Sequence, residues 1–396
     1  MSIFYQNIRS VSGRTSELRV NLQCFGLYDI FALTETNLND TIKTEELGFV
    51  SHNVIRCDRS VATSKKKSGG GVLLALQKNI KYSIIPMITN RFECICVKLH
   101  LNGYDIIIVL VYVPPFSPEI TATYHSELID FLTDSLDNYV NTYGFDNIII
   151  LGDFNVPGYD WIKTSKYSLP TGFHSNPEIR TSSVYYSNFC KNYGLFQYNF
   201  IKNISGNILD LVFSNFIDIT VSTSVDALFD CDSHHKPLDI CLPVSRPKNL
   251  NLSEFIFDYK NADFDLINQV IQESGILELD TTTDINIQTE LLSDFLNRII
   301  NEYVPKFEIK IGRFPGWFSH ELISLTINKL KFHKLFKIYR TEFYYNFFKD
   351  QRSICKILSN RDNIRYNEEI EDSLSTSSKA FFKHVNNITI FHRLCI

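Results

Sequence analysis

The 396-residue chain lacks several features that define other classes of protein. Its nine cysteines are scattered, with Cys94 and Cys96 the only close pair, so neither a zinc-knuckle spacing nor a disulfide framework is visible. Residues 1–10 lack the apolar core of a signal peptide, and the aliphatic run 106–113 is too short to span a bilayer. A net charge of −5 argues against a protein that coats nucleic acid over its whole surface. We therefore expect a soluble, intracellular chain with no membrane partner.

The composition is nevertheless sufficient for a large packed interior, with 44% hydrophobic and 13% aromatic residues. The length exceeds that at which a single core usually stops growing, which favours two domains. Up to about residue 245, short apolar runs recur, whereas beyond the Pro-Val-Ser-Arg-Pro segment at 243–247 long helical patterns replace them. We predict one domain over 1–245 and a mostly helical region over 246–396.

Seven apolar runs predict strands in the first domain, at 30–33, 72–76, 94–99, 106–113, 148–151, 209–213 and 238–242. Helical patterns lie between some of them. Ser117, Pro118 and Glu119 form a typical helix opening, because a hydroxyl cap and a proline precede an acid near the positive end of the helix dipole. Segments 15–25 and 182–193, each followed by glycine, predict two more helices. Such a mixture indicates an α/β or α+β layered fold.

The most informative segment is 148–155, where the run Ile-Ile-Ile-Leu ends on Gly-Asp-Phe-Asn. Four aliphatic residues, three of them β-branched, favour a buried strand. Asp153 and Asn155 then emerge on a loop at the end of that strand, where catalytic groups concentrate. The alternative is an ordinary β-turn, since turns also favour Gly, Asp and Asn.

Four more polar side chains end or interrupt apolar runs, namely Glu35, Tyr112, Asp210 and His235. An isolated buried charge is costly, so these groups need partners. In the simplest partnership they share one site, in which Glu35 ligates Mg²⁺ or Mn²⁺ and Asp210 orients the imidazole of His235. Such a set suits phosphodiester hydrolysis by an aligned water. Taken singly, each position is equally a surface carboxylate or a satisfied core histidine.

The order of seven short motifs resembles that of the endonuclease/exonuclease/phosphatase family, and more narrowly the apurinic-type endonuclease domain of non-LTR retrotransposons. The motifs are QNIRS at 6–10, LTET at 33–36, GGGV at 69–72, YVPP at 112–115, GDFN at 152–155, LDL at 209–211 and SHHKP at 233–237. The resemblance covers roughly residues 3–242. Its specificity lies in the order of the motifs, because no single one would suffice.

This resemblance implies a four-layer sandwich of two mixed β-sheets flanked by helices, and a magnesium-dependent cut at one DNA phosphodiester. It implies that Glu35 is a metal ligand and that Asn7 and Tyr112 contact or position the scissile phosphate. Asp153 and Asn155 would act on the nucleophile or the leaving group. The Asp210–His235 pair would stabilise the transition state or serve as the base. Which acid makes which proton transfer stays open. In mobile elements the cut leaves a 3′-hydroxyl for a reverse transcriptase, which implies action in the nucleus.

One position departs from the family motif Ser-Asp-His-x-Pro, because His234 stands in place of the acid. Loss of that carboxylate is expected to weaken Mg²⁺ binding, since Mg²⁺ prefers oxygen ligands. A shifted loop carrying Asp230 or Asp232 would compensate, or a neutral His234 would favour Mn²⁺. We predict a metal-dependent DNA endonuclease with impaired magnesium-dependent cleavage. The alternatives are a non-catalytic nucleic-acid-binding remnant and a phosphatase on the same fold.

Two further segments have compositions that suit nucleic acid. The KKKSGGG loop at 65–71 offers ammonium groups and backbone amides to phosphates, or is a solvated hairpin. Residues 317–374 combine a helical pattern with many Lys, Arg, Phe and Tyr, which suits nucleic acid or a solvated face opposite an aromatic stripe. This region resembles the helical connector of such elements. Because no reverse-transcriptase motif follows, retrotransposition would need element RNA and a reverse transcriptase supplied in trans.

Overall fold

The computed structural model describes residues 1–25, 28–60, 62–63, 69–87, 91–101, 104–143, 147–159, 161–163, 168–170, 176–216, 218–230, 233–244, 255–276, 285–308, 314 and 317–376. The chain forms two compact units. The larger unit comprises Met1–Lys248 and Gly316–Ile396, and the smaller one Asn249–Pro315.

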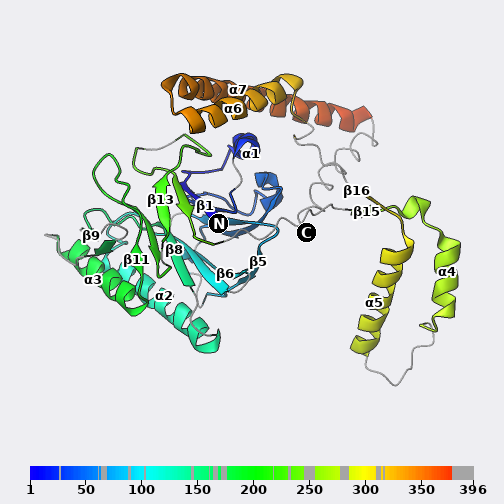
Figure 1. Cartoon of the computed structure of the whole chain (residues 1–396), viewed down its shortest axis with the longest axis horizontal. Helices are drawn as coiled ribbons and strands as arrows, with labels where there is room; N and C mark the ends of the chain where they lie inside the picture. The colour runs from blue at the N-terminus through cyan, green and yellow to red at the C-terminus, as the bar shows by residue number, and fades with distance from the viewer. Residues whose placement is uncertain are drawn as a thin grey trace. The chain divides into compact units, whose positions relative to one another are not determined.

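Two mixed β-sheets pack face to face in the larger unit (Figure 1). The first has the order β13-β14-β1-β2-β4-β3, formed by β1 (Ser2–Asn7), β2 (Ile30–Thr34), β3 (His52–Cys57), β4 (Val72–Gln77), β13 (Thr220–Thr223) and β14 (Leu238–Cys241). The second has the order β5-β6-β7-β8-β12-β11-β10-β9. Its strands are β5 (Lys81–Ile84), β6 (Glu93–Leu101), β7 (Tyr104–Tyr112), β8 (Asn147–Asp153), β9 (Trp161–Lys163), β10 (Ser168–Pro170), β11 (Phe196–Gln197) and β12 (Asp210–Ser214). In each sheet one pair is parallel, β1 with β2 and β7 with β8.

Helices cover both outer faces of the two sheets. Helix α1 (Thr15–Cys24) and the 3₁₀ turn η1 (Thr44–Leu47) pack on the first sheet, and α2 (Ala122–Tyr143) and α3 (Pro177–Asn192) pack on the second. The packing of strand β8 explains why its sequence is apolar throughout. Ile148 and Ile150 face the helices, whereas Ile149 and Leu151 face the opposite sheet, so both faces of the strand are buried. The predicted four-layer sandwich is confirmed.

The remaining elements are mostly helical. The smaller unit contains β15 (Phe255–Phe257), the 3₁₀ turn η2 (Tyr259–Asn261), α4 (Phe264–Glu273), α5 (Ile285–Tyr303) and β16 (Lys306–Glu308). In the larger unit α6 (His320–Tyr339) and α7 (Glu342–Thr376) form a hairpin against α1 (Figure 1). Among the described helices, none combines the length and apolar character that a membrane crossing requires.

All seven predicted strands are present, but two predicted helix starts are wrong. The segment at Ser117 is a turn, in which the Ser117 hydroxyl accepts hydrogen bonds from the amides of Glu119 and Ile120, and the helix begins only at Ala122. The helix expected from residue 182 begins at Pro177, because the Asn176 side chain caps it. In both places a short polar side chain bonds the local backbone, which propensity alone does not locate.

Gly152 is a position at which this fold does not tolerate a side chain. Its φ is +151°, and a Cβ placed there would lie 1.8 Å from the carbonyl oxygen of Val111 on β7. We expect Gly152→Ala to lower the free energy of unfolding by roughly 3 kcal/mol or more, measured by urea unfolding. Gly13→Ala is the control, since Gly13 also has a positive φ but no atom within 4 Å of the added Cβ. That variant should lose only about 1 kcal/mol, and equal losses would contradict the clash.

Candidate active site

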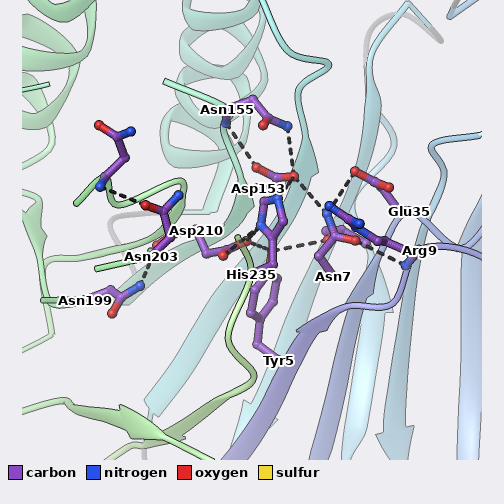
Figure 2. A network of polar contacts seen from close by, with 12 residues as sticks. Tyr5, Asn7, Arg9, Glu35, Asp153, Asn155, Asn199, Asn203, Asp210 and His235 are labelled. Atoms are coloured by element: carbon purple, nitrogen blue, oxygen red, sulfur yellow. Dashed lines mark hydrogen bonds and ion pairs between the residues drawn. The ribbon is translucent and has the colours of Figure 1, made fainter. Parts of the chain in front are cut away.

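The predicted site residues converge because five strands reach the same edge of the sandwich. Strand β1 ends at Asn7, β2 ends just before Glu35, and β7 and β8 end at Tyr112 and Asp153. In the sheet register Asp153 pairs with Tyr112 on one side and with Asp210, the first residue of β12, on the other. Residues that are up to 228 positions apart in sequence therefore share one site (Figure 2).

Asn7 is the bridge between the two sheets at this edge. Its Nδ2 donates hydrogen bonds to Glu35 Oε1 at 2.9 Å and to Asp153 Oδ2 at 3.0 Å. Asn155 holds the same Asp153 carboxylate from the other side, with its amide N–H at 3.1 Å from Oδ1 and its Nδ2 at 2.8 Å from Oδ2. The Asp153 carboxylate is fully buried and fixed in one orientation.

The imidazole of His235 joins this cluster through two carboxylates. Its Nδ1 lies 3.0 and 3.1 Å from the Asp210 oxygens, and its Nε2 lies 3.7 Å from Asp153 Oδ2 (Figure 2). Contact of Nδ1 with Asp210 fixes the ring orientation and leaves Nε2 facing Asp153. The predicted Asp210–His235 pair is therefore present as a geometric pair.

The sequence analysis did not predict two residues that hold Asp210 in place. The Tyr5 hydroxyl donates to Asp210 Oδ1 at 2.6 Å, and Asn199 Nδ2 donates to the Asp210 carbonyl at 2.6 Å. Tyr5 lies two positions before Asn7 on β1, so both side chains emerge on the same face of the strand. That alternation was the available signal for Tyr5, whereas Asn199 carries none without the strand pairing.

Tyr112 is held beside a buried ion pair that sequence reasoning also missed. Glu93, its partner in the register of β6 and β7, accepts from Arg59 Nε at 2.6 Å and from the Gly71 amide at 2.6 Å. The Arg59 guanidinium lies 5.7 Å from the centre of the Tyr112 ring. Burial, and then the carboxylates of Glu35 and Asp153, raise the pKa of Tyr112, so its hydroxyl stays protonated and able to donate.

A cleft of about 470 Å³ opens beside these groups. It is lined by Arg9, Ser10, Glu35, Asn37, Gly69, Pro115, Asn155, Leu209, His234 and His235. Five of these lining residues are non-glycine residues with φ between 46° and 90°, namely Arg9, Ser10, Glu35, Asn37 and Asn155. Such conformations cost free energy and cluster at functional sites, because the surrounding structure must enforce them. The Ser10 amide, for example, is tied to the Glu35 carbonyl at 2.7 Å.

The electrostatics of the cluster are dominated by its excess of carboxylates. Burial lowers the pKa of His235, but Asp210, and more weakly Asp153 and Glu35, outweigh it and raise that pKa to about 9. Burial, Asp210 and Glu35 raise the pKa of Asp153 well above its ordinary value, against the opposing effects of His235 and Asn7. Three carboxylates thus surround one imidazolium, and the site has negative charge in excess.

This donor set fits a hard divalent cation. One ligand atom each from Asp153, Asp210 and His235 lies within 4.8 Å of the others, and Asn7 links Glu35 to Asp153. Carboxylate oxygens are the ligands that Mg²⁺ prefers, and a cation there would offset the charge that raises the pKa of Asp153. Glu35, the predicted ligand, lies outside the tight group of three but faces the cleft.

His234 is exposed and lines the cleft beside His235, at the position where the family motif has its acid. The carboxylate of Asp230, one of the two acids that could compensate, lies 3.6 Å from Arg352 Nη2 and 3.7 Å from Lys356 Nζ on α7. Asp232 and the lysines at 65–67 lie outside the described residues. No described carboxylate therefore replaces the motif acid in the residues that line this cleft.

No protein-family model matches the chain, and no curated protein matches its sequence. Among solved structures, it is similar to an AP endonuclease from Archaeoglobus fulgidus, with 15% identity, a TM-score of 0.41, and coverage of 62% of this chain and 100% of that one. It is similar to the endonuclease domain of TRAS1, a telomere-specific non-LTR retrotransposon, with 13% identity, a TM-score of 0.39, and coverage of 60% and 96%.

A third similar structure is the 3′ phosphatase NExo from Neisseria bound to product DNA hairpin, with 16% identity, a TM-score of 0.38, and coverage of 61% and 99%. The structural neighbours thus include nucleases and phosphatases. Another similar structure is an endonuclease/exonuclease/phosphatase family protein from Leptotrichia buccalis, with 14% identity, a TM-score of 0.40, and coverage of 62% and 100%.

Proposed function

We propose that the chain is a divalent-metal-dependent DNA endonuclease whose cleavage with Mg²⁺ is weakened by His234. The observation that carries this proposal is the bridge made by Asn7, whose amide holds Glu35 and Asp153 from separate sheets at 2.9 and 3.0 Å. Maintaining the fully buried Asp153 carboxylate beside the half-buried Glu35 carboxylate is costly in a purely structural role. A site that receives a cation and a phosphodiester accounts for that cost.

The ion would be held by Glu35 on the cleft side, with Asp153 and Asp210 completing the negative surroundings. When bound, Mg²⁺ or Mn²⁺ supplies charge neutralisation and polarisation at the scissile phosphate. The protonated Tyr112 donates a hydrogen bond to a phosphate oxygen, and Asn7 holds the Glu35 and Asp153 carboxylates in position around the phosphate. Asn155 fixes the Asp153 carboxylate, which we assign as the group that accepts a proton from the attacking water.

His235 is assigned the role of transition-state stabiliser rather than base. In the metal-free chain burial lowers the pKa of His235, but Asp210, and more weakly Asp153 and Glu35, raise it to about 9, which favours a cationic ring over a general base. A cationic donor is what the developing negative charge on a pentavalent phosphorus requires. Asp210 maintains that charge and the orientation of the ring.

The order of the motifs extends the proposal to target-site nicking for retrotransposition in the nucleus. The cut would leave a 3′-hydroxyl for a reverse transcriptase supplied in trans together with element RNA. A second candidate, a non-catalytic nucleic-acid-binding remnant, is favoured by one observation, the exposed imidazole of His234 in place of a carboxylate in the cleft.

The experiment that tests the proposal compares the full chain with Glu35→Gln on supercoiled plasmid, an abasic duplex and p-nitrophenyl phosphate, each with Mg²⁺ or Mn²⁺. We expect plasmid nicking that Mn²⁺ supports better than Mg²⁺ and that Glu35→Gln lowers about 100-fold. Glu45→Gln, an exposed carboxylate on η1, is the matched control and should nick normally.

Three other results would redirect the assignment. Nicking that survives Glu35→Gln would overturn the site. Hydrolysis of the phosphomonoester without nicking would favour the phosphatase alternative. Binding of DNA with no turnover under either metal would favour the remnant.

A further inference from the structure

The α6–α7 hairpin is anchored to the sandwich through one part of its length. Lys329 is 2% exposed, and its Nζ lies 3.4 Å from Asn21 Oδ1 on α1. His333 Nε2 lies 2.5 Å from Asp226 Oδ1, and Lys356 Nζ lies 3.5 Å from Glu17 Oε1. These basic side chains are used for attachment.

The end of the hairpin, where α6 ends and α7 begins, differs from the anchored part in its charge and its exposure. Residues 331–349, called here the hairpin tip, contain five lysine or arginine residues and one acidic residue, besides the anchoring His333, in a chain whose net charge is −5. Lys331, Lys334, Arg340 and Lys349 are exposed, and none of them has an acidic partner in the described part of the chain. The tip therefore presents basic groups that the fold itself does not neutralise.

Aromatic rings interleave with these cations. The tip holds eight Phe and Tyr residues, and four of them are largely exposed: Tyr339 at 59%, Phe343 at 61%, Tyr345 at 43% and Phe347 at 41%. The rings support one another, with Phe343 centred 5.2 Å from Phe347, and Phe347 stacked on Phe332 at 4.7 Å. The result is an ordered aromatic platform rather than a set of loose side chains.

Together, unpaired cations and exposed rings are the two elements that bind a single strand of nucleic acid. The cations attract the phosphate backbone, and the ring faces accept unpaired bases by stacking. A duplex would use only the cations, because its bases are already stacked on one another. We propose that the hairpin tip is a binding surface for single-stranded nucleic acid, separate from the cleavage cleft.

The test uses the full chain carrying Glu35→Gln in EDTA, so that binding is measured without cleavage and independently of the proposed nuclease activity. Fluorescence anisotropy compares a labelled 20-nucleotide single strand with a duplex of the same length. We expect the single strand to bind more tightly at equal salt. Tyr339→Ser with Phe343→Ser should weaken that binding about tenfold or more, whereas Tyr339→Phe with Phe343→Tyr should retain it.

The contribution of the cations is read from the salt dependence. Neutralising Lys331, Lys334 and Lys349 to Gln should reduce the slope of log affinity against log salt by about 2. A matched triple variant, Lys81→Gln with Arg180→Gln and Lys191→Gln, removes the same charge from β5 and α3 and should leave the slope unchanged. An equal loss in this control, duplex binding as tight as single-strand binding, or ring-dependent dimerisation in sedimentation velocity would each overturn the proposal.

Discussion

The Asp210→Asn variant is expected to nick plasmid DNA about 10²- to 10⁴-fold more slowly than the parent chain. Asp210 faces His235 Nδ1 with both oxygens, at 3.0 and 3.1 Å, and accepts the Tyr5 hydroxyl at 2.6 Å. An amide of the same shape keeps the packing but removes the charge that holds the imidazole protonated. The ring loses its positive charge at neutral pH, and with it the stabilisation of the transition state.

The same substitution has a signature that a loss of folding would not produce. In the metal-free chain the pKa of His235 should fall from about 9 toward 6.5, followed by NMR titration of the imidazole. Because folding raises the pKa of His235, its ion pair with Asp210 stabilises the folded parent chain fully below pH 6.5. That stabilisation is lost as the pH rises through 9. The difference in unfolding free energy between parent and variant should therefore shrink over that range.

Asp239→Asn is the matched control for this prediction. Asp239 Oδ1 accepts the Tyr28 hydroxyl at 2.6 Å, just as Asp210 accepts that of Tyr5. The other contacts of the Tyr28 hydroxyl are with Ser224 and Asp226, outside the Asp153–Asp210–His235 group. We expect this variant to nick at the parent rate. Normal nicking by Asp210→Asn, or an unchanged pKa of His235, would show that the pair has no part in the reaction.

The predicted residues lie together in the structure because most of them mark the ends of strands. Runs such as 148–151 are apolar throughout since both faces of β8 are buried, and the polar residue that ends such a run stands out. Where several strands end at one edge, those residues meet. Glu35 and Asp153 were therefore accessible to reasoning from the pattern of apolar runs, whereas Asn7 was indicated only by the resemblance to the family motif.

The supporting residues were not accessible in the same way. Arg59 and Glu93 form a buried pair only because β6 places Glu93 opposite Tyr112, and that register is a property of the sheet. Asn199 donates a hydrogen bond to the backbone carbonyl of Asp210 on β12, and a contact with the backbone cannot be recognised from the pattern of side chains in the sequence. Such contacts follow from strand order, which a single sequence does not specify.

The attachment of the last two helices shows the same limit. Lys329 and His333 belong to a basic helical pattern that is typical of a solvated face, yet both are buried against α1 and the loop after β13. Their partners, Asn21 and Asp226, are separated from them by more than 100 residues. Charge alone does not distinguish a lysine that anchors the hairpin from one, such as Lys334, that faces solvent.

Restoring the motif acid with His234→Asp is expected to raise nicking with Mg²⁺ about 10- to 100-fold. His234 is exposed in the same cleft as Glu35 and His235, so a carboxylate there adds an oxygen ligand where the site now has an imidazole. Mg²⁺ gains more from this change than Mn²⁺, because Mn²⁺ accepts nitrogen more readily. The gain should appear as a lower Mg²⁺ concentration for half-maximal nicking and as tighter Mg²⁺ binding by calorimetry.

Two variants separate the new carboxylate from other consequences of removing the imidazole. His234→Asn has nearly the same size as the aspartate without its charge, and should leave the Mg²⁺ requirement close to that of the parent. His234→Asp combined with Glu35→Gln should lose the gain, since both oxygens are proposed to serve one ion. If His234→Asn matched His234→Asp, the imidazole would be obstructing the cleft rather than depriving the metal of a ligand. If neither changed the rate, the position of His234 would not limit nicking with Mg²⁺.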